Sequence, residues 1–269
     1  MIYAEVIGDP IEQSKSPIIH AHWFETTGIE ADYRRTQVAE ADVAAHFASR
    51  LADPEWRGSN VTMPDKYAAL EAAAHKSDLA IAARAANMIV PRDGALAAGN
   101  SDVGAILAVL RSLYEEERPM DHVALYGTGG AARAVLVATR AISLDAITIH
   151  ARDLQKARAL AVEFGLSREP VALDVPPRAD GVVNATPLGM VGRQCLNCDV
   201  SGLSDDGWVF DMVTAPVETP LVLQARARGL AIRDGIEMLV EQAAASFEAF
   251  FGQPPNRERD AELYAMLRA

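Results

Sequence analysis

Apolar residues recur along the first hundred positions at two alternating spacings. Short, nearly continuous apolar runs predict three β-strands, at 3–7, 33–38 and 56–63. Apolar residues three and four positions apart predict three helices between them, at 17–27, 40–52 and 65–74. Gly28 and Gly58 are interpreted as the stops of the helices that precede them. The pattern therefore predicts an α/β unit at the start of the chain.

The pattern changes after a predicted β-hairpin at 87–98, whose turn is Asp93-Gly94. A helix is predicted at 103–114, and a last one begins after Gly235 and stops at Gly252. Between these helices four further strands are expected, at 122–126, 146–150, 181–184 and 208–211. Strands that alternate with helices in this way are typical of a parallel, doubly wound sheet. We therefore expect two α/β domains, with the chain crossing near residue 100 and again near 235.

Composition and charge narrow the class of protein. The chain has 269 residues, half of them hydrophobic, which is enough apolar material for a sizeable core. A net charge of −12 argues against a nucleic-acid partner, although a local basic site can still bind an anionic small molecule. No apolar run approaches membrane-spanning length, the N-terminus resembles a strand, and there are only two cysteines. We expect a cytoplasmic protein with no membrane partner.

A glycine-rich turn follows the predicted strand at 122–126 and opens an alanine-rich helix. Its residues are Gly127, Thr128, Gly129, Gly130, Ala131 and Ala132, the G-x-G-x-x-A form of the dinucleotide fingerprint. Gly127 permits the tight turn, Gly129 lets the backbone approach a pyrophosphate, and the helix N-terminus supplies amide donors. Because the motif stands between a strand and a helix, it predicts a Rossmann-like dinucleotide site.

The end of the next strand bears on which dinucleotide is bound. An NAD site usually places an acidic residue there to bind the ribose 2′-hydroxyl. This chain has Ala151, Arg152 and Asp153, followed by Lys156. A guanidinium can stack on adenine and pair with a 2′-phosphate, which favours NADP. Asp153 can be a helix N-cap or the acid of an NAD site, so both cofactors stay open at this point.

Polar residues of the first half suggest an anion site and an acid–base pair. Ser14 and Ser16 precede Pro17, and Ser16 is expected to be the N-cap of the following helix, whose N-terminus could also hold a carboxylate. Lys66 follows a strand that ends in polar residues. Asp102 is interpreted either as an N-cap or as the acid–base partner of Lys66.

Taken together, these stretches resemble the shikimate dehydrogenase family. The matching segments run in the family's order over nearly the whole chain: GDPIEQSKSPIIH, GSNVTMPDK, AANMI, GNSD, GTGGAARA, VVNATPLGM, the DM to TPL run and DGIEMLVEQA. The resemblance implies an NADP-dependent enzyme that reduces 3-dehydroshikimate to shikimate on the route to chorismate and the aromatic amino acids. It implies a substrate-binding and catalytic domain at 1–101, an NADP-binding domain at 102–235, and C-terminal helices at 236–269 that return to the first domain.

The family pattern assigns roles by position, with Lys66 and Asp102 as the catalytic pair. The residues expected around the substrate are Ser14, Ser16, Asn60, Thr62, Lys66, Asn87, Asp102, Thr214 and Gln242. Those expected along the cofactor are Gly127, Thr128, Gly129, Gly130, Ala131, Ala151, Arg152, Asp153, Lys156, Met212 and Gly235. The resemblance requires no metal, and a homodimer is one assembly that it allows.

Several positions depart from the family pattern. Ala151 replaces an asparagine, Asp153 a hydroxyl residue and Glu237 a glycine; Ser101 replaces a threonine and Ala105 a glycine. Thr214 replaces a tyrosine that belongs to the substrate site in the family. Two alternatives therefore stay open beside the leading interpretation. One is a paralogue that oxidises quinate or a related hydroxy acid with NAD, and the other is a dinucleotide-binding sensor without turnover.

Overall fold

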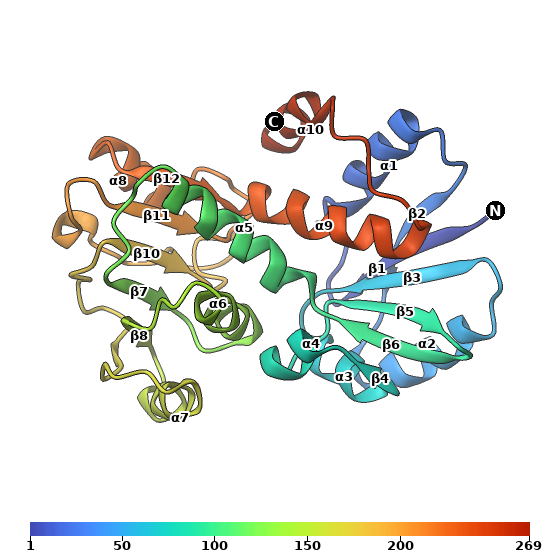
Figure 1. Ribbon diagram of the computed structural model, residues 1–269, viewed down its shortest axis with the longest axis horizontal. Helices are drawn as coiled ribbons and strands as arrows, with labels where there is room; N and C mark the ends of the chain where they lie inside the picture. Colours follow the sequence, from blue (N-terminus) through green and yellow to red (C-terminus); the bar gives the residue numbers. More distant parts are fainter. The chain divides into compact units, whose positions relative to one another are not determined.

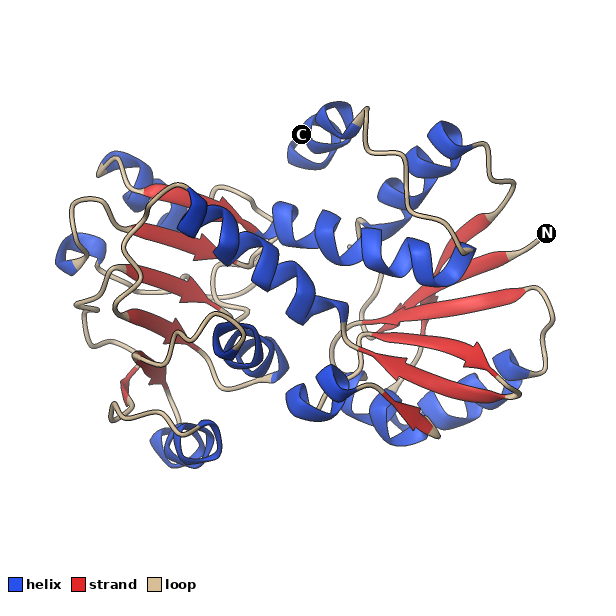
Figure 2. Ribbon diagram, in the orientation of Figure 1, coloured by secondary structure: helices blue, strands red, loops and turns tan.

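The computed structural model describes all 269 residues, which form two compact units (Figures 1 and 2). One unit consists of Met1–Gly104 together with Val240–Ala269, and the other of Ala105–Leu239. Each unit is built around a six-stranded sheet. The α/β fold class predicted from the sequence is confirmed.

The sheet of the first unit has the strand order β2-β1-β3-β5-β6-β4. Its strands are β1 (Tyr3–Gly8), β2 (Asp32–Gln37), β3 (Trp56–Val61), β4 (His75–Lys76), β5 (Met88–Arg92) and β6 (Ala95–Gly99). All neighbours are parallel except at β5, which is antiparallel to both β3 and β6. The helices of this unit are α1 (Ser16–Thr27), α2 (Val43–Leu51) with the 3-10 turn η1 (Glu40–Asp42), α3 (Lys66–Ala72), α4 (Asp78–Ala83), most of α9 (Gly235–Phe251) and α10 (Asp260–Arg268).

Helices cover both faces of this first sheet (Figure 1). On one face Tyr3, Ile7 and Trp56 pack against residues of α2 and α3. On the other face the alternate residues of the strands, such as Val6 and Tyr33, pack against Phe250 of α9. Because successive side chains of a strand point to opposite faces, one strand contributes to both cores.

The sheet of the second unit is parallel throughout, in the order β12-β11-β10-β7-β8-β9. Its strands are β7 (Val123–Tyr126), β8 (Ile147–Ala151), β9 (Val171–Ala172), β10 (Gly181–Asn184), β11 (Trp208–Asp211) and β12 (Ala231–Asp234). Its helices are α5 (Ser101–Glu115), which starts in the first unit, α6 (Gly130–Arg140), α7 (Leu154–Phe164), the 3-10 turn η2 (Val200–Gly202) and α8 (Pro220–Ala227). Read from β9, the order is 3-2-1-4-5-6, the strand order of dinucleotide-binding sheets.

One local prediction of the fold is wrong, and three strands were not predicted. Gly58 does not stop a helix, because it lies inside β3, and α2 ends earlier, at Leu51. A Cβ at Gly58 would come within 2.4 Å of the Phe250 ring, so packing against α9 requires a glycine there. The strands β4, β9 and β12 were not predicted, since two of them have only two residues and β12 has a polar half. None of the helices is both long and apolar enough to cross a membrane.

Candidate active site

Polar residues gather at one edge of the first sheet because of the direction of its strands. The parallel strands β1 and β3 end at this edge, and β6 ends there too. Since β5 runs the opposite way, it begins at the same edge. The topology therefore brings together Asn60 and Thr62 at the end of β3, Asn87 before β5, and Ser101 and Asp102 after β6.

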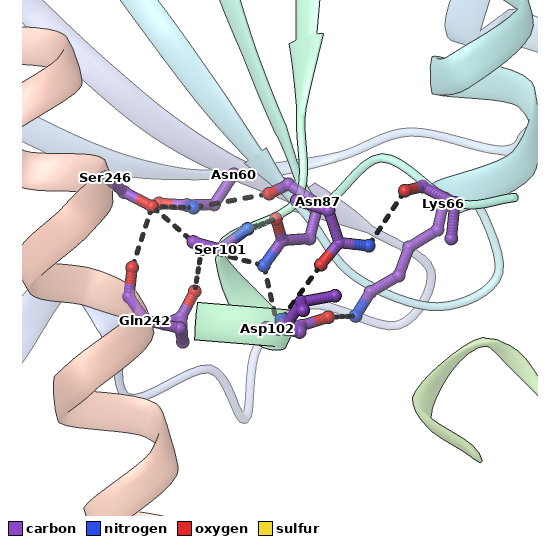
Figure 3. Close-up of polar contacts among 10 residues, drawn as sticks. Asn60, Lys66, Asn87, Ser101, Asp102, Gln242 and Ser246 are labelled. Carbon is purple, nitrogen blue, oxygen red and sulfur yellow. Dashed lines mark hydrogen bonds and ion pairs between the residues drawn. The ribbon is translucent and has the colours of Figure 1, made fainter. Parts of the chain in front are cut away.

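Lys66 and Asp102 form an ion pair at one side of this cluster (Figure 3). Lys66 is the first residue of α3, and its Nζ donates a hydrogen bond of 2.6 Å to Oδ2 of Asp102. Asn87 Nδ2 donates to the other carboxylate oxygen, Oδ1, at 2.8 Å. Asp102 is 7% exposed and is the second residue of α5. The structure thus joins the two residues of the expected catalytic pair, and both oxygens of Asp102 are occupied.

This arrangement leaves the ammonium group of Lys66 with two further hydrogens. An ammonium group has three donors and no acceptor, and only one of them is directed at Asp102. The side chain of Lys66 is 22% exposed, so the group is accessible to a small molecule. A positioned ammonium group can donate to an oxygen that gains negative charge and can transfer a proton to it. The cluster therefore has the components of general acid catalysis at a carbonyl.

Asn60 and Gln242 extend the cluster toward α9 (Figure 3). Asn60 Nδ2 donates to Oγ of Ser246 at 2.7 Å and to the main-chain oxygen of Asn87 at 3.3 Å. Its Oδ1 accepts from the Tyr33 hydroxyl at 2.6 Å. Gln242 Oε1 accepts from Ser101 Oγ at 3.5 Å. Both amide hydrogens of Asn60 are used within the protein, so Asn60 can contact a ligand only through a second lone pair of Oδ1.

Tyr33 and Ser246 are residues of this site that the sequence analysis missed. Ser246 Oγ accepts from Asn60 and donates to the main-chain oxygen of Gln242 at 3.0 Å, one helical turn earlier. Tyr33 is 7% exposed, and the His20 ring stacks on it with the ring centroids 3.8 Å apart. Burial raises the pKa of Tyr33 well above its usual value, so the phenol donates its hydrogen. The available signal was the helical spacing of Gln242 and Ser246, which places both on one face of α9.

Ser14 and Ser16 lie at the start of α1, after the end of β1. The prediction that Ser16 is the N-cap is wrong: the cap position is Lys15, without a side-chain hydrogen bond, and Ser16 is the first helical residue. The Ser14 hydroxyl instead accepts a long hydrogen bond, 3.4 Å, from the main-chain nitrogen of Ser16. Thr62 follows β3, and only its main-chain groups form hydrogen bonds, with Ile7 and Asp65. The structure does not link Ser14, Ser16 or Thr62 to Lys66 by hydrogen bonds.

The residue before Lys66 is a buried acid without a partner. Asp65 has no exposed surface, and neither carboxylate oxygen has a hydrogen-bond partner within the protein. Burial, and then the charges of Glu40 and Asp9, raise the pKa of Asp65 to about 6, while His46 acts to lower it. When folding raises the pKa of a carboxyl group, the protein loses stability as that group ionises. The loss occurs as the pH rises from the pKa of the unfolded state, near 4, to that of the folded state.

We predict that Asp65→Asn stabilises the protein more at pH 8 than at pH 5. Above pH 6 the charged Asp65 lowers the free energy of unfolding by on the order of 3 kcal/mol. The asparagine variant regains this amount less the cost of burying its amide group. Urea unfolding at both pH values measures the change. Asp78→Asn, at the exposed start of α4, is the matched control and should show no pH-dependent change. The same gain at both pH values for Asp65→Asn would contradict the buried charge.

The glycine-rich turn of the second unit lies where its strand order reverses, between β7 and α6. Gly127 has a φ of +117°, and a Cβ there would be 3.0 Å from the main-chain oxygen of Ala185. Gly129 is the N-cap of α6 without a side-chain cap, and a Cβ on it would meet no protein atom within 4 Å. The free amide groups of the helix and the open approach to them fit the pyrophosphate of a dinucleotide.

Residues expected along the cofactor lie at the carboxyl ends of β8, β11 and β12, strands of the same parallel sheet. Ala151 ends β8 and is buried, Arg152 is exposed, and the Asp153 carboxylate accepts from the main-chain nitrogen of Lys156 at 2.9 Å. Asp153 is therefore the N-cap of α7. Met212 and Gly235, which are also expected along the cofactor, lie side by side. A Cβ on Gly235 would be only 2.5 Å from the main-chain oxygen of Met212. Thr214 is half-buried in the segment after β11.

Two stretches of the chain match known protein families, and whole proteins match it over nearly its full length. Residues 6–89 match the shikimate dehydrogenase substrate binding domain, and residues 235–262 match the shikimate 5'-dehydrogenase C-terminal domain. Shikimate dehydrogenase (NADP(+)) of Sphingopyxis alaskensis is 46% identical, over 99% of this chain and 97% of the relative. The protein of the same name from Azorhizobium caulinodans is 38% identical, over 98% of this chain and 95% of the relative.

Solved structures share the fold over the full length. Shikimate 5-dehydrogenase of Thermus thermophilus, in complex with NADP(H) and shikimate, has a TM-score of 0.87 at 29% identity and covers 99% of this chain and 100% of its own. Quinate dehydrogenase of Corynebacterium glutamicum, in complex with NAD, has a TM-score of 0.84 at 30% identity and covers 98% of this chain and 99% of its own.

Proposed function

The chain belongs to the shikimate dehydrogenase family, and on this premise we propose that it catalyses the reversible, NADP-dependent reduction of 3-dehydroshikimate to shikimate. The observation that carries the proposal is the bonded set of Lys66, Asp102 and Asn87 at the sheet edge. The first unit binds the substrate, and the second binds the cofactor. A homodimer and a cytoplasmic location stay predictions.

The residues of the first unit have complementary roles in this reaction. NADPH, when bound, would supply the hydride that reduces the carbonyl carbon of the substrate. The ammonium group of Lys66 then stabilises the negative charge that develops on the carbonyl oxygen and delivers a proton to it. Asp102 holds the ammonium group in place from one side, and Asn87 holds Asp102 from the other. Ser14 and Ser16 bind the carboxylate of the substrate, and Thr62 and Gln242 lie near its ring.

The residues of the second unit fit NADP. The uncapped N-terminus of α6 binds the pyrophosphate, and Gly129 leaves room for its approach. Arg152 is exposed at the end of β8, where a guanidinium can pair with a 2′-phosphate. Asp153 is engaged as the N-cap of α7, which accounts for an acidic residue there without a role in NAD binding. The segment Ala151–Lys156, Met212 and Gly235 complete the surface along the cofactor.

Oxidation of quinate with NAD is the second candidate function. It is supported by the likeness to the Corynebacterium glutamicum quinate dehydrogenase and by Thr214, which departs from the family pattern. One assay separates the candidates: reduction of NADP and of NAD is followed with shikimate and with quinate in all four combinations. The highest kcat/KM with shikimate and NADP supports the proposed function. A higher value with quinate and NAD contradicts it.

The Thr214 departure makes a prediction about substrate affinity. In the family a tyrosine at this position reaches the substrate carboxylate, and threonine is too short for the same contact without a bridging water. We expect Thr214→Tyr to lower KM for shikimate about tenfold, since a hydrogen bond to a charged group is worth about 1.5–3 kcal/mol before the water is displaced. Ser14→Ala, by the same argument, should raise KM strongly.

Thr214→Phe is the matched control, because it adds the same ring without the hydroxyl. If the phenol hydroxyl is responsible, only the tyrosine variant binds shikimate more tightly. A KM for shikimate that stays unchanged or rises in Thr214→Tyr would show that the pocket is not a shortened version of the family's, and would favour another substrate.

A further inference from the structure

Two side chains on one face of β2 contact the segment that carries Ser14 and Ser16. Gln37 Nε2 donates to Oδ1 of Asp9 at 2.8 Å, at the start of this segment. Arg35 donates to the main-chain oxygen of Ser14 through Nε at 2.9 Å and through Nη2 at 2.6 Å. Tyr33 is on the same face of β2, and its hydroxyl group donates to Oδ1 of Asn60 in the site. Residues two apart in a strand point to the same face, so these contacts form a row.

Arg35 makes the most specific contact of this row. Two donors of a planar guanidinium converge on one carbonyl oxygen, which fixes the position and the direction of the Ser14 peptide group. Arg35 belongs to a different element from Ser14 and forms no ion pair with an acidic residue, so its charge is not neutralised by the protein. The next residue, Lys15, contacts α10, because its Nζ donates to the main-chain oxygen of Leu267.

We propose that Arg35 is a positioning residue for the substrate carboxylate. It holds the Ser14 peptide so that the Ser14 hydroxyl faces the carboxylate, and its uncompensated positive charge attracts the same group. This inference rests on the proposed function, because it takes Ser14 and Ser16 as the carboxylate site. It assigns to β2, the edge strand of the first sheet, a role in substrate specificity.

Arg34 provides a matched control on the same strand. Its side chain points to the opposite face, where Nε donates to Asp32 Oδ2 at 2.7 Å and the guanidinium lies 3.9 Å from the centre of the Tyr3 ring. Arg34 and Arg35 are both exposed, so Arg34→Met and Arg35→Met remove the same charge from the same strand. The two variants differ in whether the contact with Ser14 is lost.

The test compares KM and kcat of Arg35→Met and Arg34→Met with shikimate and with its methyl ester, which lacks the charge. Arg35→Met should raise KM for shikimate about tenfold, the effect of losing one charge-assisted contact, with little change in kcat. The KM of the ester should change much less, and Arg34→Met should leave both unchanged. Arg35→Lys keeps the charge but not the two convergent donors, so it should restore KM only in part.

The proposal is overturned if KM for shikimate stays unchanged in Arg35→Met, if KM of the ester rises equally, or if Arg35→Lys restores KM completely. A purely structural role would lower the thermal midpoint and raise KM for both ligands alike. Failure of the proposed function is seen separately, as absence of turnover in the unmodified protein. In that case Arg35 is tested by calorimetric titration of shikimate into the same proteins. The Kd of each variant, relative to that of the unmodified protein, should then change by the factor expected for KM.

Discussion

Replacing Lys66 by alanine should lower kcat about 100-fold or more, the range for loss of a positioned acid or of a donor to a developing oxyanion. KM for shikimate should change much less, because several other groups hold the substrate. The physical reason is that the ammonium group interacts most strongly when charge has developed on the carbonyl oxygen. An interaction that strengthens in the transition state contributes to kcat more than to binding.

Steady-state kinetics in the direction of NADP reduction measures the effect. Lys76→Ala is the matched control, since Lys76 lies just beyond the same α3 helix and pairs with Glu71 at 3.2 Å, away from Asp102. We expect the control to keep its kcat. Asp102→Asn should also lose turnover, because an amide no longer anchors the ammonium group as a carboxylate does. Full activity of Lys66→Ala would remove Lys66 from the catalytic assignment.

The elements of this fold were predictable where local pattern decides the structure. The strand at 3–7 and the helix at 17–27 were expected from their apolar residues, and the structure places β1 and α1 there. The turn from Gly127 to Ala132 was expected because glycine spacing and a following helix are both local signals. The Lys66 and Asp102 pair was suggested by family motifs, and its contact depends on the order of β3, β5 and β6.

Other features depend on residues far apart in the sequence, and no local pattern indicated them. Glu5 lies inside the strand β1 with no exposed surface. It accepts hydrogen bonds from Thr36 on β2, from Arg50 on α2, and from Ser59 on β3. Burial acts to raise the pKa of Glu5, but the hydrogen bonds from His46, Arg50 and Thr36 outweigh it and lower the pKa to about 2. Such a site forms only when four elements, β1, β2, β3 and α2, meet.

The same limit explains Ser16 and Tyr33. Ser16 has the residue type and the following proline of an N-cap, yet the helix begins one residue earlier than that assignment requires. Helix propensity depends only on neighbouring residues, so it cannot indicate that Arg35, on the strand β2, binds the Ser14 peptide. Tyr33 was assigned to a strand by its apolar character, whereas its hydroxyl group is a donor to Asn60. Local pattern locates an element but not the partners of its polar atoms.

Arg152 carries the second large effect, on the choice of cofactor. It follows β8 directly, is exposed, and makes no hydrogen bond or ion pair within the protein, so its guanidinium is available to a ligand. Pairing with a 2′-phosphate is a charge-assisted contact worth about 1.5–3 kcal/mol. Arg152→Ala should therefore weaken NADP binding roughly tenfold to a hundredfold, while NAD binding, which lacks that phosphate, should change little.

The matched control for this change is Arg158→Ala. Arg158 lies on α7, the helix that follows Arg152, and its guanidinium pairs with Glu169 at 3.5 Å. We expect NADP and NAD to bind this control as they bind the unmodified protein.

Asp153→Ser should have the opposite effect and make NADP bind more tightly. Serine can still cap α7, but the change removes a negative charge next to the phosphate. Fluorescence titration of each protein with NADPH and NADH gives the ratio of the two dissociation constants. If Arg152→Ala weakens both cofactors equally, the guanidinium only stacks on the adenine that they share, and discrimination between NADP and NAD must come from other residues of the second unit.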